Sequence, residues 1–381
     1  MKDFTTGSIP KLLIVFLAPL LLSNVLQAFY ILIDAFWAGR LLGSIGVAIV
    51  AIGLPVIFLL SSLFIGLVVG ASILAGQAFG SHNRQELSHI ISSSIIATAA
   101  LSVSISILGV IFTTHILKSI NTPGAIFHGA HVFLSIILVA MVPSCLVQWF
   151  TAIMNATGDS RTPFKIILIS LILNAFLAPV LITGAGIMPP LGIAGSALST
   201  VIANVVAVML CFIFWRSHHL SEIAPFHFIV KGDTLRRITA IGLPLSLQMI
   251  VVSSSFLFIL SQANAFGASV TAAFGIGSRI DQFAFLALFA VTAAISAMTA
   301  QNFGAKKFDR IPQIALWGTI ISGIIAALFS AAVMIFPDVI SGLFTRDPAV
   351  IEITRHYFRT VGVGYIALAI LFSYQGVLRG A

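Results

Sequence analysis

Long runs of apolar residues, separated by short polar breaks, fill the chain from its first residues to its last. A helix that crosses a membrane needs about 20 mostly apolar residues, and ten runs reach that length. These runs are 10–39, 46–79, 88–113, 124–154, 163–184, 193–215, 238–265, 268–300, 312–336 and 349–379. Several exceed the minimum, so we expect helices that tilt, kink or protrude. The pattern predicts an all-α polytopic membrane protein.

Basic residues are divided unevenly between the two sides of this predicted bundle. Only Arg40, Lys118 and Arg346 lie on one side, whereas 13 of the 19 Lys and Arg residues lie on the other side, with the N-terminus. The remaining three lie within predicted segments. Because basic loops stay in the cytoplasm, we expect a multi-pass protein of the plasma (inner) membrane with a cytoplasmic N-terminus.

Composition supports a membrane protein and argues against a water-soluble one. The chain is 59% hydrophobic and 8% charged, with a mean hydropathy of +1.13, whereas a soluble domain carries roughly 25% charged residues. The net charge of +8 comes from loops between apolar runs, so no nucleic-acid partner is expected. The first segment is too long for a signal peptide and lacks a small-residue cleavage site, which predicts a retained span.

The two halves of the chain resemble each other at an offset of 224–225 residues. Pro19 matches Pro244, and the motif QAFG at 77–80 matches QNFG at 301–304. Six helices per copy would insert both copies the same way up, which predicts a parallel pseudo-two-fold repeat about the membrane normal. Chance likeness between apolar sequences is the alternative.

The repeat predicts two lobes, the second of them incomplete. Residues 1–215 would form a six-helix N-terminal lobe, 216–237 a cytoplasmic loop, and 238–381 a C-terminal lobe with four of its six helices. Residues 149–156 align with 374–381, where the sequence ends. We therefore expect a twelve-helix protein truncated before its last two helices, or a fragment of one.

A series of short motifs runs through both halves in a fixed order. They are IDAFWAGRL (33–41), GQAFG (76–80), NATGD (155–159), GSALST (195–200), GLP (242–244), AQNFGA (300–305) and GVLRG (376–380). In order and spacing they resemble the multidrug and toxic compound extrusion (MATE) family. The resemblance implies two six-helix lobes around a central cavity that opens to one side at a time. It also implies export of organic cations or amphipathic compounds, driven by inward flow of protons or sodium ions.

The branch of the family bears on the coupling site. One branch places acids in helices seven and ten, where this chain has Val252 and Leu368. The chain is closer to the DinF-like branch, whose cation site lies in the N-terminal lobe. That resemblance implies a site of Asp34, Asn174 and Thr200, with Ala178 in place of a second Asp. Since sodium needs several oxygen ligands and at least one charge, the substitution favours proton over sodium coupling.

Two acidic residues lie well inside predicted segments. A carboxylate there is a functional candidate by default, so we expect Asp34 to bind the coupling cation; the alternative is a helix-end carboxylate that reaches interfacial water. Asp281 is expected to face the cavity and bind a cationic substrate or a proton, or else to form a structural pair. Other candidates for the substrate cavity are Arg279, Gln282 and Gln248.

Prolines interrupt two of the predicted helices. Pro19 and Pro244 each remove a backbone hydrogen bond and predict a kink, which either permits bending or is a static packing feature. The intramembrane amides, Gln248 and Asn174 among them, are alternatively helix-to-helix hydrogen bonds.

No enzyme motif is present. The sequence has no phosphate-binding loop, no nucleophile elbow and no zinc-protease motif, so we expect neither an enzyme nor a cofactor beyond the coupling ion. His218, His219 and His227 fit no tight metal motif and predict a solvated loop. We expect a monomer in the lipid bilayer that handles small organic cations or amphipaths. A lipid-linked sugar flippase of a related branch, or a nonfunctional truncated remnant, is the alternative.

Overall fold

The structure is a computed structural model that describes residues 2–184, 189–217 and 230–381. The described residues form helices and connecting turns, without a strand. The three histidines at 218, 219 and 227 lie outside the described residues. The long helices are α1 (Ile9–Gly80), α2 (Arg84–Ser119), α3 (Gly124–Ala156), α4 (Arg161–Thr183), α5 (Ile193–Ser217), α7 (Gly232–Ala265), α8 (Ala268–Gly304), α9 (Ile311–Ile335) and α11 (Pro348–Gly380). Short helices at Phe308–Arg310 and Pro337–Gly342 (α10) complete the described set.

The nine long helices of the described chain supply ten membrane crossings. Each of the nine is long and apolar enough to span a bilayer. Helix α1 has 72 residues but breaks at Gly43, whose φ of 69° and ψ of −158° are not helical. Glycine adopts positive φ without steric cost, so the chain reverses there and α1 crosses twice. The prediction of an all-helical bundle with ten segments is confirmed.

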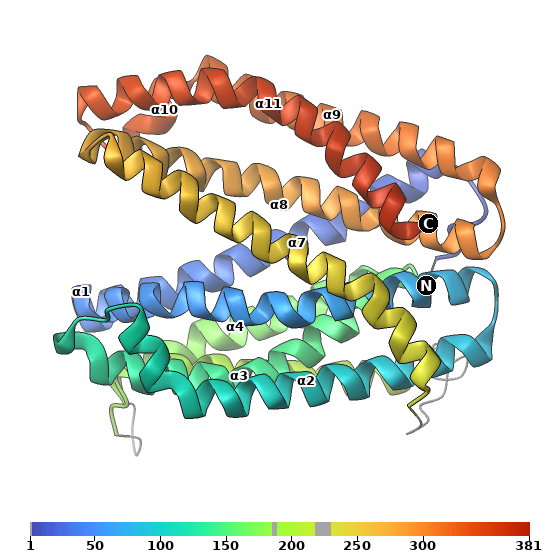
Figure 1. Cartoon of the computed structure of the whole chain (residues 1–381), viewed down its shortest axis with the longest axis horizontal. Coiled ribbons are helices and arrows are strands. Elements are labelled where there is room, and N and C mark those ends of the chain that lie inside the picture. Colours follow the sequence, from blue (N-terminus) through green and yellow to red (C-terminus); the bar gives the residue numbers. More distant parts are fainter. Residues whose placement is uncertain (1, 185–188, 218–229) are drawn as a thin grey trace.

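The helices form two groups that are joined at one end (Figure 1). Helices α2 to α5 pack on one another and on α1, whereas α8, α9 and α11 pack on one another. Helix α7 crosses between the groups and packs mainly on α1. Both chain termini lie at the same end of the bundle, together with the loops 81–83, 157–160 and 305–307. We call this the basic end, because most Lys and Arg residues flank it.

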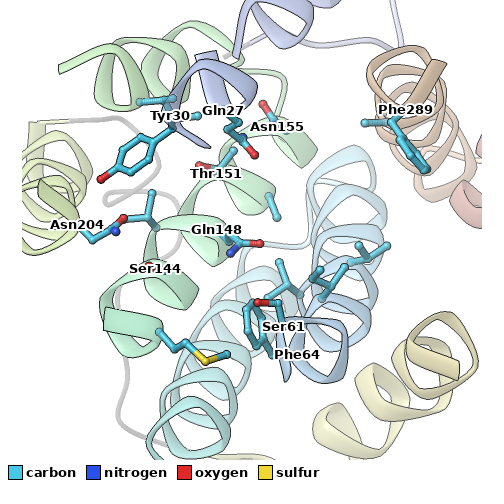
Figure 2. Close-up of a pocket in the computed structure, with 18 of the residues that line it drawn as sticks. Gln27, Tyr30, Ser61, Phe64, Ser144, Gln148, Thr151, Asn155, Asn204 and Phe289 are labelled. Atoms are coloured by element: carbon cyan, nitrogen blue, oxygen red, sulfur yellow. The ribbon is translucent and has the colours of Figure 1, made fainter. Parts of the chain in front are cut away.

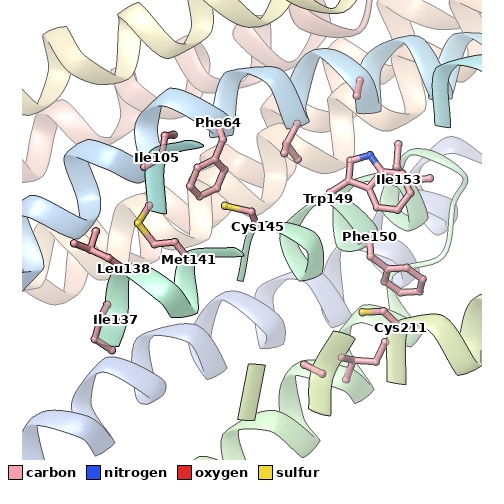
Figure 3. Packing of buried hydrophobic residues seen from close by; sticks show 14 of the residues in the cluster. Phe64, Ile105, Ile137, Leu138, Met141, Cys145, Trp149, Phe150, Ile153 and Cys211 are labelled. Carbon is pink, nitrogen blue, oxygen red and sulfur yellow. The ribbon is translucent and has the colours of Figure 1, made fainter. Parts of the chain in front are cut away.

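Buried apolar side chains form a cluster in each group and a further cluster between them, where the start of α1 packs on α8 and α9. The largest lies among α1 to α5 and includes Phe64, Met141 and Trp149 (Figure 3). The indole Nε1 of Trp149 donates a hydrogen bond of 2.8 Å to Ser94 Oγ. Another cluster lies among α8, α9 and α11, around Tyr365. The predicted lobe boundaries fall at the loop between α5 and α7, most of which lies outside the described residues, so they stay a prediction.

Glycines allow the two groups to approach closely at the basic end. A Cβ added to Gly80 would overlap the backbone of Gln301, and a Cβ added to Gly304 would overlap the backbone of Gln77. Small residues at such crossings bring helix backbones into contact. These two reciprocal contacts join the matching motifs 77–80 and 301–304. The predicted repeat requires the two glycines to lie at the same end of the bundle, and these contacts place them there.

The N-terminal segment adds polar links at the same end. The backbone N–H of Phe4 donates to Gln301 Oε1 at 3.0 Å, and Asn302 Nδ2 donates to Phe4 O at 3.1 Å. Lys307 Nζ donates to Thr5 O at 2.9 Å. These bonds tie residues before α1 to the end of α8 and the loop after it. The two groups of helices are therefore held together where the termini lie.

Candidate functional site

A cavity of about 600 Å³ lies between the helices and is lined by residues of α1, α3, α4, α5, α8 and α11. Figure 2 shows polar residues around it, including Tyr30 of α1, Gln148 of α3 and Asn204 of α5. Most of the other lining residues are apolar. A mostly apolar pocket of this size with a few polar groups is typical of small-molecule sites.

Asp34 lines this cavity from the first crossing of α1. Its Oδ2 accepts a hydrogen bond of 3.3 Å from Thr200 Oγ1 of α5. Asn174 Nδ2 of α4 donates to Thr200 Oγ1 at 3.2 Å and to Ser199 Oγ at 3.4 Å. The structure thus brings together Asp34, Asn174 and Thr200, which are far apart in the sequence.

One oxygen of Asp34 remains without a partner. Its Oδ1 is buried and has no hydrogen-bond partner among the described residues. A buried acceptor in that condition is unfavourable unless something satisfies it. Asp34 Oδ1 is therefore the atom that a proton, a metal cation or a cationic ligand would bind.

Ala178 lies one turn after Asn174 on α4 and is fully buried. Its methyl group offers no oxygen ligand to a cation near Asp34. A buried methyl group therefore occupies the position at which the family resemblance implies a carboxylate. Among the described residues that line the cavity, Asp34 is the single acid.

Asp281 of α8 has different surroundings. The hydroxyls of Tyr357 and Tyr365, both on α11, donate hydrogen bonds to its two carboxylate oxygens. Tyr365 is itself buried, with 1% of its surface exposed. Asp281 is not among the described residues that line the cavity, although the sequence predicts that it faces one. Its geometry is that of a helix-to-helix link between α8 and α11.

A family model described as MatE matches residues 19–180 and 244–381. The chain belongs to the MATE family. The "Probable multidrug resistance protein YoeA" of Bacillus subtilis (strain 168) is 34% identical over 344 residues, which are 89% of this chain and 74% of that protein. An FAD transporter of Shewanella oneidensis is 26% identical over 349 residues, 91% of this chain and 77% of that protein.

Solved structures show the same fold. A crystal structure of MATE in complex with MaD3S matches with a TM-score of 0.90 at 21% identity, covering 99% of this chain and 84% of that chain. The family model and the relatives confirm the family that the motifs resemble. Its members are transporters and not enzymes. The assignment to the DinF-like branch stays a prediction.

The remaining predicted cavity residues of this MATE transporter lie outside the described cavity lining. Arg279 and Gln282 of α8 are exposed on the helix surface. Gln248 of α7 does not line the cavity itself. Its Oε1 accepts a hydrogen bond of 3.2 Å from Nη2 of Arg379, which does line it. Their roles in substrate binding stay predictions.

Sequence reasoning missed Arg379. It counted this residue among the basic residues that flank the bundle, but its side chain lines the cavity from the last turn of α11. Two signals were present in the sequence. Arg379 lies in the GVLRG motif, and the internal repeat aligns it with Met154. A charged residue in one copy that aligns with an apolar residue in the other is a difference between the two halves that the sequence alone displays.

The two predicted kink prolines lie inside helices, Pro19 in α1 and Pro244 in α7. The carbonyl of Pro19 accepts a hydrogen bond of 2.8 Å from Ser23 Oγ. Pro244 lies two residues after Gly242, whose backbone touches that of Gly66 on α1. Pro244 thus lies next to a contact between helices, and the part of both prolines in bending stays a prediction.

Proposed function

We propose that this MATE transporter is a cation-coupled secondary antiporter that exports organic cations or amphipathic compounds by alternating access. The observation that carries the proposal is Asp34, a cavity-lining carboxylate with one hydrogen-bonded oxygen and one buried oxygen without a described partner. A charged group placed so deep in a membrane protein is unfavourable unless it is paired or hydrated. Binding of a cation, or of a proton, removes that penalty.

Coupling follows when two ligands compete for Asp34. A proton and an organic cation satisfy the same carboxylate, so the binding of one releases the other. Alternating access then requires that the two conformations bind the proton with different affinity, since a ligand shifts an equilibrium only by its differential affinity. Exchange at Asp34 would link inward proton flow to outward substrate flow.

Protons are favoured over sodium by the composition of the site. Asp34 would be the sole charge in a sodium site, and Asn174 and Thr200 would supply neutral oxygens. Ala178 contributes no side-chain oxygen. A hard cation is held by several oxygens, whereas proton exchange needs a single carboxyl group. Asp34 supplies the single carboxyl group that proton exchange needs.

The membrane orientation belongs to the same proposal. The basic end of the bundle would face the cytoplasm, because most Lys and Arg residues flank it. Both termini would then be cytoplasmic, and Gly43 would lie at the outer end of α1. The membrane would be the plasma (inner) membrane, and the working unit a monomer.

The cavity supports a broad substrate class. Its volume of about 600 Å³ accommodates a drug-sized molecule, and its mainly apolar wall suits amphipathic compounds. Relatives named for multidrug resistance and for FAD transport agree with an organic, amphipathic substrate. A flippase for lipid-linked sugars is less favoured, because Arg379 is the single basic residue among the described lining residues.

Transport into sealed vesicles tests this function directly. The purified chain is reconstituted, and uptake of a fluorescent organic cation is followed while a pH gradient or a sodium gradient is imposed alone. We expect the pH gradient to drive accumulation and the sodium gradient to have little effect. Accumulation driven by sodium alone would reject proton coupling, and accumulation driven by neither gradient would reject the antiporter.

A further inference from the structure

The wall of the cavity carries two charges of opposite sign among its described residues, Asp34 and Arg379. They lie at different depths. Asp34 is nine residues before Gly43, or about 14 Å along the helix from that break. Arg379 lies one residue before the end of α11, at the basic end of the bundle. The cavity is thus acidic toward one end and basic toward the other.

Arg379 has no acidic partner in the described part of the chain. Its Nη2 donates a hydrogen bond of 3.2 Å to Gln248 Oε1, a neutral amide. Its Nε is buried and has no described hydrogen-bond partner. A guanidinium in this condition is incompletely satisfied, because it carries five N–H donors in a planar fork. That fork fits a carboxylate or a phosphate, which it binds through two parallel hydrogen bonds.

The charge of Arg379 also affects which molecules the cavity can hold. A simple monocation is attracted by Asp34 but repelled by Arg379 at the basic end. A molecule that carries an acidic group relieves the unpaired guanidinium, and any basic group that it also carries is free to interact elsewhere. The cavity therefore favours molecules that carry an acidic group together with a basic one over molecules that have a positive charge alone.

We propose that Arg379 forms an anion subsite at the basic end of the cavity, so that the preferred substrates are amphipathic molecules bearing a carboxylate or phosphate. The proposal rests on the proposed transport function, and it specifies the substrate class of the same cavity. Arg379 is the residue that contacts the acidic group, and Gln248 positions its guanidinium through the bond between α11 and α7.

Two dyes of nearly the same shape provide the probe. Rhodamine 110 carries a free carboxylate, and rhodamine 123 is its methyl ester without that negative charge. Binding of each dye to the purified protein in detergent is measured by fluorescence anisotropy at neutral pH. We expect the wild type to bind the acid more tightly than the ester.

Three variants separate the anion subsite from a structural role. In Arg379→Gln, binding of the acid should weaken about tenfold or more, whereas binding of the ester should stay the same or become tighter. Arg379→Lys, which keeps the charge, should retain most of the preference for the acid. Arg359→Gln is the matched control, because Arg359 is an exposed arginine of the same helix outside the described cavity lining, and it should change neither affinity.

Other results would overturn the subsite. Equal loss of both dyes in Arg379→Gln would show that Arg379 only holds α7 and α11 together. An unchanged preference for the acid in that variant would show that the carboxylate binds elsewhere. The proposed transport function is judged separately, by pH-driven uptake of the acid and of the ester in wild-type vesicles. If that uptake fails while Arg379→Gln still abolishes the preference for the acid, the subsite stands and the antiporter does not.

Discussion

Two carboxylates lie inside membrane-crossing helices of the same protein, and their surroundings differ. Asp34 of α1 lines the cavity, accepts one hydrogen bond from Thr200, and has a buried oxygen without a described partner. Asp281 of α8 is outside the described cavity lining and accepts a tyrosine hydroxyl on each oxygen. The first has a free position for a ligand, and the second does not.

The contrast separates two reasons for keeping an acid in a membrane. Tyr357 and Tyr365 satisfy Asp281 from one helix, among the aromatic and aliphatic side chains of the cluster formed by α8, α9 and α11. Such an acid specifies how two helices pack. Asp34 is surrounded by the neutral donors of α4 and α5, which satisfy it only in part. Depth in the membrane alone therefore does not distinguish the two acids, whereas the hydrogen-bond partners of their oxygens do.

The largest expected effect is that of Asp34→Asn, which keeps the shape of the side chain and removes its titration. Proton-driven export should fall to the level of empty vesicles, because no other acid lines the described cavity. Drug resistance of cells that express the variant, normalised to the amount of protein in the membrane, measures this effect.

Asp281→Asn is the matched control for that experiment. We expect it to lower the yield or thermal stability of the protein, with export per folded molecule retained. Normal resistance in a well-expressed Asp34→Asn variant would contradict the assignment, and so would a loss of coupling in Asp281→Asn alone.

The next effect concerns the ion that Asp34 binds. Ala178→Asp adds a carboxylate one helical turn from Asn174, which supplies the oxygen ligands and the charge that a sodium site needs. Uptake driven by a sodium gradient alone should rise about tenfold or more above the wild-type level. If the variant folds and its sodium response equals that of the wild type, the inference from Ala178 is wrong.

A smaller effect, on stability, is expected from removing a hydrogen bond to Asp281. Tyr365→Phe removes one of its two hydroxyl donors and leaves a carboxylate oxygen unsatisfied, which costs about 1–3 kcal/mol. The melting temperature in detergent should fall by several degrees, whereas export per folded molecule should stay unchanged. Loss of pH dependence without loss of stability would instead make Asp281 a coupling residue.

The smallest effect concerns an exposed pair at the end of the bundle opposite the termini. Arg355 Nε and Nη2 of α11 donate hydrogen bonds of 2.8 and 3.0 Å to Asp338 of α10, and this guanidinium holds the pKa of Asp338 below its usual value. The stabilisation is therefore present above about pH 4 and disappears as the pH falls through the lowered pKa.

Asp338→Asn should accordingly lower the melting temperature by less than about 2 °C at pH 6. The wild type and the variant should converge when melting is measured below about pH 4. A difference between them that persists or grows in acid would show that the pair does not account for the effect.

The sequence predicted the crossings and the Asp34 cluster for identifiable reasons. Apolar runs long enough to cross a bilayer depend on local composition, so the structure reproduces them. Asp34, Asn174 and Thr200 were found through the family resemblance, because no local pattern links positions separated by so many residues. The break at Gly43 was found as a gap between two apolar runs, and the structure confines the reversal of the chain there to one residue with non-helical φ and ψ.

Other features of the structure could not be predicted from the sequence. The partners of Asp281 lie 76 and 84 residues away on α11, and only the packing of two helices decides that both hydroxyls reach the same carboxylate. Arg379 was misplaced because a basic residue at a helix end usually reaches water. Its side chain also lines the cavity and donates a hydrogen bond to Gln248 of α7, which the charge pattern could not reveal.

The most direct test of the account is proton movement driven by substrate. Vesicles containing the protein and a pH-sensitive dye are given an outward gradient of an organic cation, without an imposed pH or sodium gradient. Wild-type vesicles should move protons in the direction opposite to the substrate, and Asp34→Asn vesicles should move none, while Asp281→Asn vesicles should behave like the wild type. Equal proton movement in Asp34→Asn and wild-type vesicles would contradict the claim that Asp34 exchanges the proton for the substrate.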